Sequence, residues 1–142
     1  MPRLTEKGGL LFATVSVPFK NQDTFELLDL VVDTGAFLSI VDTSLVDYLG
    51  YSAADALKKS VLDGAAGRSE GYLIKVPNFK CLGFEIPDFQ IACHDMNTRL
   101  GVAGILGMNF LKLFRIDLNY NTGEIYLMEK IIPASARNRN CP

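Results

Sequence analysis

The sequence has little that would mark a secreted, membrane-bound or nucleic-acid-binding protein. Its 142 residues include three cysteines, Cys81, Cys93 and Cys141, whose odd number and wide spacing argue against a disulfide framework. A formal net charge of −2 offers no basic surface for nucleic acid or an anionic membrane. No apolar run approaches the length that spans a bilayer, and the N-terminus lacks the hydrophobic stretch of a signal peptide. We therefore expect a soluble, cytoplasmic protein without a nucleic-acid partner.

Histidine is also scarce, since His94 is the only one. Although it stands between Cys93 and Asp95, a zinc site usually needs four ligands in paired short spacings, and no second Cys/His pair exists. A Ser-His-Asp or Cys-His mechanism would have to use this one ring, and no nucleophile motif surrounds the cysteines. We expect neither a metal nor a cofactor.

What is present describes an ordinary globular domain. Apolar residues make up 49% of the chain and charged residues 21%, which excludes a disordered protein. The length favours one domain with a sizeable core. We expect residues 1–9 to form an N-terminal extension, residues 10–130 the domain, and residues 131–142 a mobile tail.

One carboxylate stands at the end of an apolar, β-branched run. Residues 28–32 lead into Asp33, which is followed by Thr34, Gly35 and Ala36. A run of this composition favours a buried strand, so a charge at its end needs hydrogen-bond partners or a functional role. The alternative to a functional role is a structural aspartate in a turn.

A second segment, about 70 residues later, makes the first more specific. Ile105, Leu106 and Gly107 run directly into a predicted short helix at residues 109–112. The two segments together resemble the retropepsin-like aspartic proteases, over roughly residues 10–127. The resemblance is closer to cellular members than to the shortest retroviral proteases, because a further hairpin is predicted after the helix.

This resemblance implies a mostly-β fold, a closed acid-protease barrel with one or two short helices. Asp33 would be catalytic, Thr34 would lock two such loops together, and Gly35 would make the turn and offer an amide to the carboxylate. Ala36, Ile105, Leu106 and Gly107 would support the active site. Since Asp-Thr-Gly occurs once, the second aspartate must come from a second copy of the chain.

A glycine-rich hairpin is predicted between residues 61 and 76, because two strand-like runs flank a turn of small residues. The resemblance implies a flap that contacts substrate through Gly64, Ala65, Ala66 and Gly67, and the alternative is an ordinary exposed hairpin. Leu62, Ile74 and the region of Ile105 are candidates to line the cleft.

The remaining elements follow from apolar periodicity and turn signals. Strands are expected at residues 10–17, 25–32, 38–41, 79–82, 85–93 and 100–106, with a hairpin at 114–120 and 124–128. A helix should begin after Asp42 and Thr43 and end at Gly50.

The function that these features favour is an aspartic endopeptidase that works as a homodimer on polypeptide substrates. The alternative is a dimerisation or peptide-binding module that keeps the fold with little or no turnover.

Overall fold

Strands dominate the structure, as the apolar periodicity predicts. The computed structural model describes residues 2–64, 67–96 and 102–129. The strands are β1 (Thr5–Lys7), β2 (Leu10–Pro18), β3 (Phe25–Val32), β4 (Ile40–Asp42), β5 (Lys58–Gly64), β6 (Gly67–Cys81), β7 (Phe84–His94), β8 (Gly104–Leu106), β9 (Phe114–Leu118) and β10 (Ile125–Glu129). The helical elements are α1 (Thr43–Tyr48), the single 3-10 turn η1 (Ala53–Asp55) and α2 (Met108–Leu111).

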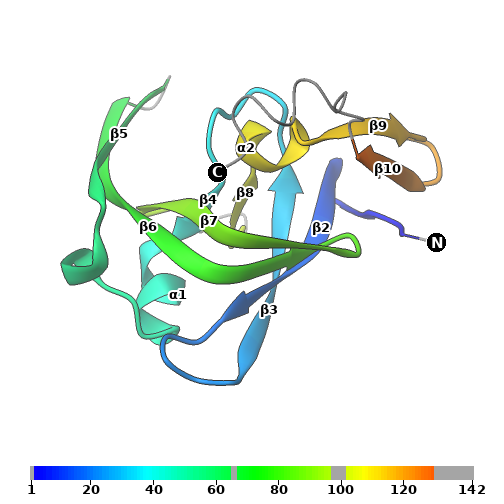
Figure 1. Ribbon diagram of the computed structural model, residues 1–142. Coiled ribbons are helices and arrows are strands. Elements are labelled where there is room, and N and C mark those ends of the chain that lie inside the picture. Colours follow the sequence, from blue (N-terminus) through cyan, green and yellow to red (C-terminus); the bar gives the residue numbers. More distant parts are fainter. Residues whose placement is uncertain (1, 65–66, 97–101, 130–142) are drawn as a thin grey trace, which may run out of the picture.

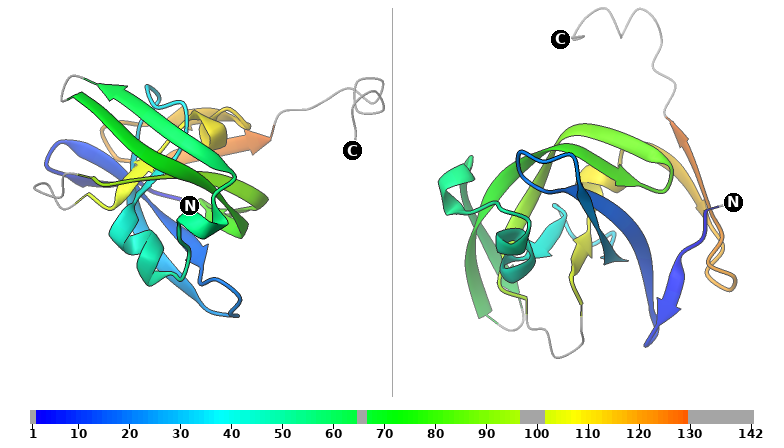
Figure 2. Two further views of the ribbon diagram at one scale, coloured as in Figure 1. Left: turned by 90° about the vertical axis from the view of Figure 1, so that its left-hand side faces the viewer. Right: turned by 90° about the horizontal axis from the view of Figure 1, so that it is seen from below.

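The main sheet closes on itself. Its eight strands follow the order β1-β2-β3-β8-β4-β7-β6-β5, and β2 pairs in addition with β6, so that six of them form a ring (Figures 1 and 2). Val15 lies opposite Cys81 where the ring closes. The prediction of a mostly-β fold with short helices is confirmed.

The ring encloses an aromatic and aliphatic core. Phe79 and Phe110 are fully buried, and Phe79 stacks on Phe89 with ring centroids 4.1 Å apart. Phe110 meets Phe79 edge to face at 6.1 Å, a geometry that aromatic pairs favour. Because Phe110 belongs to α2, the short helix is anchored to the centre of the core.

Two predicted local structures are confirmed in detail. β2 and β3 form an antiparallel hairpin, from Phe12 opposite Val31 to Pro18 opposite Phe25. The carboxylate of Asp42 accepts from the backbone N–H of Ser44 and so caps α1.

The strand predicted at residues 79–82 is not separate. β6 continues unbroken through Pro77 to Cys81, because Pro77 and Asp88 drop out of the otherwise regular β6–β7 pairing. A proline destabilises a strand little at a position where no ladder hydrogen bond needs its missing N–H.

Two other boundaries differ. β4 begins at Ile40 rather than residue 38, since the N–H of Ser39 donates to the side chain of Asn109 and not to a neighbouring strand. β8 begins at Gly104, so the predicted strand is wrong for residues 102 and 103, which are irregular, and residues 100 and 101 of its predicted range lie outside the described residues.

The two ends of the described chain lie together. β1 pairs with β2, so residues 5–7 of the predicted extension belong to the sheet. β9 and β10 form the predicted C-terminal hairpin, and the N–H of Leu4 donates to the carbonyl oxygen of Gly123 in its turn at 2.8 Å (Figure 1). Residues 130–142, which include the predicted tail, are outside the described part. No helix in the described ranges is long and apolar enough to cross a membrane.

Candidate active site

Asp33 lies where the chain crosses from one side of β8 to the other. β3 runs parallel to β8, with Val32 opposite Leu106, and β4 runs antiparallel along the other edge of β8, with Ile40 opposite Ile105. Residues 33–39 therefore form a loop, here called the Asp33 loop, that passes over the end of β8. The N–H of Asp33 still donates to the carbonyl oxygen of Leu106 at 3.0 Å, which extends the ladder to the start of the loop.

The loop holds the carboxylate through its own backbone. The N–H of Gly35 donates to Oδ1 of Asp33 at 2.8 Å, and the N–H of Ala36 donates to the Asp33 carbonyl oxygen at 3.3 Å. The carbonyl oxygen of Ala36 accepts from the N–H of Met108 at 2.8 Å, at the first turn of α2. Asp33 is half-buried, while Thr34 and Gly35 are exposed. The structure thus brings Asp33, Thr34, Gly35 and Ala36 against the segment that the sequence singled out as their support.

Gly107 permits this close approach. A Cβ atom there would lie 2.5 Å from the carbonyl oxygen of Leu38 and 2.9 Å from that of Ala36. Both are backbone atoms of the Asp33 loop and cannot move aside as a flexible side chain would. Glycine is required here for space, because its φ of −104° is open to any residue.

A hydrogen-bond network that the sequence did not reveal fixes the far end of the loop. The hydroxyl of Ser39, a fully buried residue, donates to Oδ1 of Asn109 at 2.8 Å and accepts from the N–H of Gly107 at 3.0 Å. Oδ1 of Asn109 also accepts from the N–H of Ser39, and its Nδ2 donates to the carbonyl oxygen of Gln90 on β7. Ser39 and Asn109 thus tie the loop to α2 and β7. A small polar residue inside an apolar run was the only signal in the sequence.

A cavity of about 540 Å³ opens beside Asp33 and Thr34. Apart from those two residues and Tyr120, its walls are apolar side chains, among them Leu11 and Met108, and much of the lining comes from β9 and its flanks. Tyr120 itself is 77% exposed. One chain therefore places its carboxylate at the edge of an open, largely apolar surface.

The β5–β6 hairpin extends beyond the ring at the same end of the molecule as the Asp33 loop (Figure 1, and left view of Figure 2). Gly64 and Gly67 pair at its end, and the predicted substrate-contacting residues Ala65 and Ala66 lie outside the described residues. Of the candidates to line a cleft, Leu62 and Ile105 pack as partly buried residues against one small cluster.

Ile74, the third cleft candidate, does not fit that role. It is 1% exposed and belongs to the main core, because its position on β6 turns it into the ring.

His94 is a buried structural residue. Its Nε2 lies 2.9 Å from the hydroxyl of Ser60, and its Nδ1 lies 3.1 Å from that of Ser69. Burial lowers the pKa of its imidazole, although the nearby Asp95 opposes this shift. Each ring nitrogen is hydrogen-bonded to a serine hydroxyl, and neither nitrogen bonds a carboxylate, so this is no Ser-His-Asp arrangement. Within the described ranges no three His, Cys, Asp or Glu side chains gather as metal ligands would.

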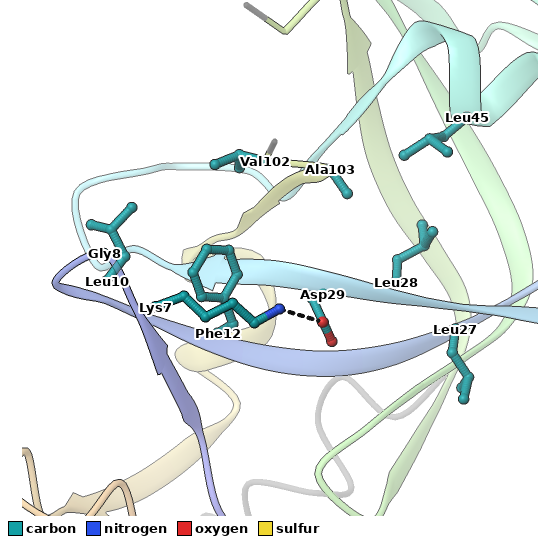
Figure 3. Close-up of a pocket in the computed structure, with 10 residues that line it drawn as sticks. All are labelled: Lys7, Gly8, Leu10, Phe12, Leu27, Leu28, Asp29, Leu45, Val102 and Ala103. Atoms are coloured by element: carbon teal, nitrogen blue, oxygen red, sulfur yellow. Dashed lines mark hydrogen bonds and ion pairs between the residues drawn. The ribbon is translucent and has the colours of Figure 1, made fainter. Parts of the chain in front are cut away.

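A second cavity, of about 460 Å³, lies between β1, β2 and β3 (Figure 3). Lys7 and Asp29 form an ion pair of 3.1 Å at its edge. Hydrogen bonds from Thr14 and then Lys7 lower the pKa of the Asp29 carboxyl. None of the residues named above for the Asp33 site lines this cavity, so it is separate from that site.

Comparisons with known proteins agree with this geometry. Residues 15–110 match the family model described as aspartyl protease, and the chain belongs to that family. The fold is retropepsin-like. Among solved structures it is similar to a retropepsin-like aspartic protease from Rickettsia conorii, at 16% sequence identity and a TM-score of 0.64, over 89% of this chain and 95% of that one. A comparison with curated protein sequences finds no match.

Proposed function

We propose that the protein is an aspartic endopeptidase that acts as a homodimer, in which each chain contributes Asp33 to one shared site. The observation that carries the proposal is the Asp33 loop itself. A half-buried carboxylate is held by the Gly35 amide directly after β3, in a chain of the aspartyl protease family. The contact with the Gly35 amide would also serve a structural turn, so the proposal depends on this loop lying beside the open cavity in a chain of that family.

The surroundings of Thr34 support a shared site. Thr34 is exposed, and its hydroxyl makes no hydrogen bond within the described part of the chain. Beside it lies the open, largely apolar cavity, to which β9 contributes Phe114, Ile116 and Leu118. Apolar surface of this kind favours burial against a partner. A second copy would cover it and bring a second Asp33 close to the first.

Two such carboxylates can hydrolyse an amide without a metal. Like charges at short distance cannot both ionise easily, so the pair shares one proton, as the aspartic-protease dyad does. The ionised carboxylate takes a proton from water while the neutral one donates its proton to the carbonyl oxygen of the scissile bond. Only the pair titrates, so neither chain has a fixed role as acid or base.

The β5–β6 hairpin is the candidate flap in this proposal. It extends beyond the ring at the same end of the molecule as the Asp33 loop and carries glycines near its tip. Leu62 on β5 and Ile105 on β8 pack on one cluster, which makes this apolar region a candidate contact for substrate side chains. Phe37, which is 82% exposed in the Asp33 loop, is a further candidate.

The test is cleavage of a denatured protein by the purified chain and by Asp33→Asn. We expect the wild type to cut and the variant to lose the activity. Asp23→Asn is the matched control, because it makes the same substitution at an exposed position in the turn after β2. Wild-type activity per chain should also fall on dilution below the dimer dissociation constant. Equal cleavage by wild type and Asp33→Asn would refute the proposal.

The second candidate function is a peptide-binding or dimerisation module on the same fold. The same exposed apolar surface beside Thr34 favours it, since this surface would serve binding as well as catalysis. Absence of cleavage by the wild type, together with retained dimerisation, would support this alternative.

A further inference from the structure

The β5–β6 hairpin separates from the ring next to His94. The last pair between β6 and β7 joins Tyr72 to Cys93, and His94 then pairs with Asp42 of β4 as the last residue of β7. Beyond this point β6 pairs only with β5 (Figure 1). His94 therefore stands at the base of the projecting part of the hairpin.

The imidazole ring of His94 joins the two strands of that hairpin. Ser60 is on β5 and Ser69 is on β6, and each hydroxyl meets one ring nitrogen, at 2.9 and 3.1 Å. The two serines are not partners in the ladder, since Ser60 pairs with Gly71 and Ser69 with Leu62. The ring thus ties two pairs of the hairpin, one on each side of the Val61–Glu70 pair, to the end of β7.

Gly71 leaves the space that the ring occupies. A Cβ atom on Gly71 would lie 2.8 Å from Nδ1 and 2.9 Å from Cε1 of His94, and would also collide with the carbonyl oxygen of Cys93. With His94 1% exposed, the ring fills a fitted site rather than resting on the surface.

Charged groups near the ring give an imidazolium little compensation. Side chains alternate along a strand, so Lys59, Asp63, Arg68 and Glu70 turn to the opposite face of the hairpin from the two serines. On the His94 side, β6 presents no charged group within residues 69–73.

Among the described residues, the remaining charges near His94 lie on β5, on β4 and just after β7. Lys58 shares the face of Ser60, is exposed and has the same sign as an imidazolium. The Asp42 carboxylate is occupied by Ser44 and by the N–H of Met96. Asp95, next along the chain, is exposed and raises the pKa of His94 by less than burial lowers it.

We propose that His94 is a positioning residue that in its neutral form ties both strands of the β5–β6 hairpin to the end of β7, and that its protonation releases them. This inference rests on the proposed function only in assigning the hairpin to the substrate cleft.

The direction of the pH effect follows from linkage. In the tied state burial holds the pKa of His94 below its ordinary value of 6.5, whereas a released, hydrated ring returns toward that value. The released state therefore binds more protons, and the tied state loses relative stability as the pH falls through and below 6.5. The gain in release is limited to about tenfold per pH unit because one proton is involved.

The test uses two readouts that need no activity. Because His94 is the only histidine, its ring proton gives one imidazole titration in the NMR spectrum. Amide hydrogen exchange, corrected for the intrinsic dependence on pH, then follows residues 59–63 and 68–71. In the wild type we expect exchange in these residues to rise as the pH falls from 7 through 6.5, by no more than about tenfold per pH unit, and to level off below the titration midpoint of His94.

Two variants separate a positioning role from a merely structural one. His94→Gln keeps a donor and an acceptor for the two hydroxyls but cannot become charged at these pH values, so its exchange should stay independent of pH. The Ser60→Ala, Ser69→Ala double variant should exchange rapidly already at pH 7. If His94→Gln does not fold, the proposal is still tested by the NMR titration of His94 in the wild type and by amide exchange in the serine double variant.

The same rise in the wild type and in His94→Gln would overturn the proposal, as would a His94 titration at or above 6.5. Neither readout involves Asp33 or substrate, so the proposed function and this inference fail separately. Where cleavage is measured, His94→Gln should alter the pH profile of KM and leave that of kcat nearly unchanged.

Discussion

Ser39 offers the sharpest test of how the Asp33 loop is held. Its hydroxyl donates to Oδ1 of Asn109 at 2.8 Å and accepts from the N–H of Gly107 at 3.0 Å, and the residue is 0% exposed. Ser39→Ala removes one oxygen atom and leaves the surrounding shape almost unchanged.

The cost of this substitution can be worked from the contacts. The buried N–H of Gly107 loses its partner, which costs roughly 1–3 kcal/mol. Oδ1 of Asn109 keeps the N–H of Ser39 at 2.9 Å, so its loss is partial. We expect Ser39→Ala to lower the free energy of unfolding by about 2 kcal/mol. If that free energy falls by about 1.5 kcal/mol per molar urea, the midpoint of urea unfolding falls by about 1.3 M.

The assay is urea unfolding followed by circular dichroism, at one fixed chain concentration because dimerisation would add to stability. Ser16→Ala is the control, since Ser16 is half-buried and no hydrogen bond of its hydroxyl is found in the described ranges; it should cost less than about 0.5 kcal/mol. A double variant with Asn109→Ala should cost less than the sum of the two single changes, because both break one network. A Ser39→Ala midpoint within error of that of Ser16→Ala would refute the reasoning.

Three further predictions concern space, charge and thiol reactivity. Gly107→Ala places a methyl group 2.5 Å from the Leu38 carbonyl oxygen, and should cost about 3 kcal/mol in urea unfolding; a cost under about 1 kcal/mol would show that the backbone can yield. Burial alone would raise the pKa of Asp42, but hydrogen bonds from Ser44 and Met96 lower it overall from its ordinary value of 3.8. The ionised Asp42 carboxylate therefore stabilises the folded protein above that pH, and this contribution is lost as the pH falls below it. Asp42→Asn should therefore lose about 1–2 kcal/mol at pH 7 and much less at pH 3, and an equal loss at both would contradict this. Burial raises the pKa of Cys81 and of Cys93 to about 12, so in a chain whose third cysteine is replaced by serine neither thiol should react with a disulfide reagent at pH 8 until the protein is unfolded.

The local elements could be predicted because their signals are local. The hairpin of β2 and β3, the cap at Asp42 and the turn ending at Gly123 each depend on residues close in sequence. The packing of the Asp33 loop against Gly107 was expected only from a resemblance to a family, since nothing in composition or periodicity brings together two segments about 70 residues apart.

What could not be predicted depends on long-range geometry. Ser39 and Asn109 are separated by 70 positions, and only the crossing of the loop over β8 brings them into hydrogen-bond distance. From the sequence, His94 was not expected to bind a metal or to act in catalysis, but its hydrogen-bond partners could not be named. Its actual partners, Ser60 and Ser69, reach it only through the pairing of β5, β6 and β7.

The strand that was predicted separately at residues 79–82 shows the opposite error, because Pro77 was given too much weight as a break in the chain of strand residues. A proline normally interrupts a strand, but β6 passes through it because the residue opposite, Asp88, has a φ of 51° and leaves the ladder. A missing pair that depends on both strands cannot be inferred from one of them.

The central claim is that two chains share one active site, and mixing tests it most directly. Wild type and Asp33→Asn are combined in equal amounts, exchanged to equilibrium and assayed at a fixed total chain concentration. If each site needs Asp33 from both chains, only wild-type homodimers are active, and the mixture should retain about one quarter of the activity of an all-wild-type sample. A mixture that retains about one half would mean that each chain works alone, and would contradict the account.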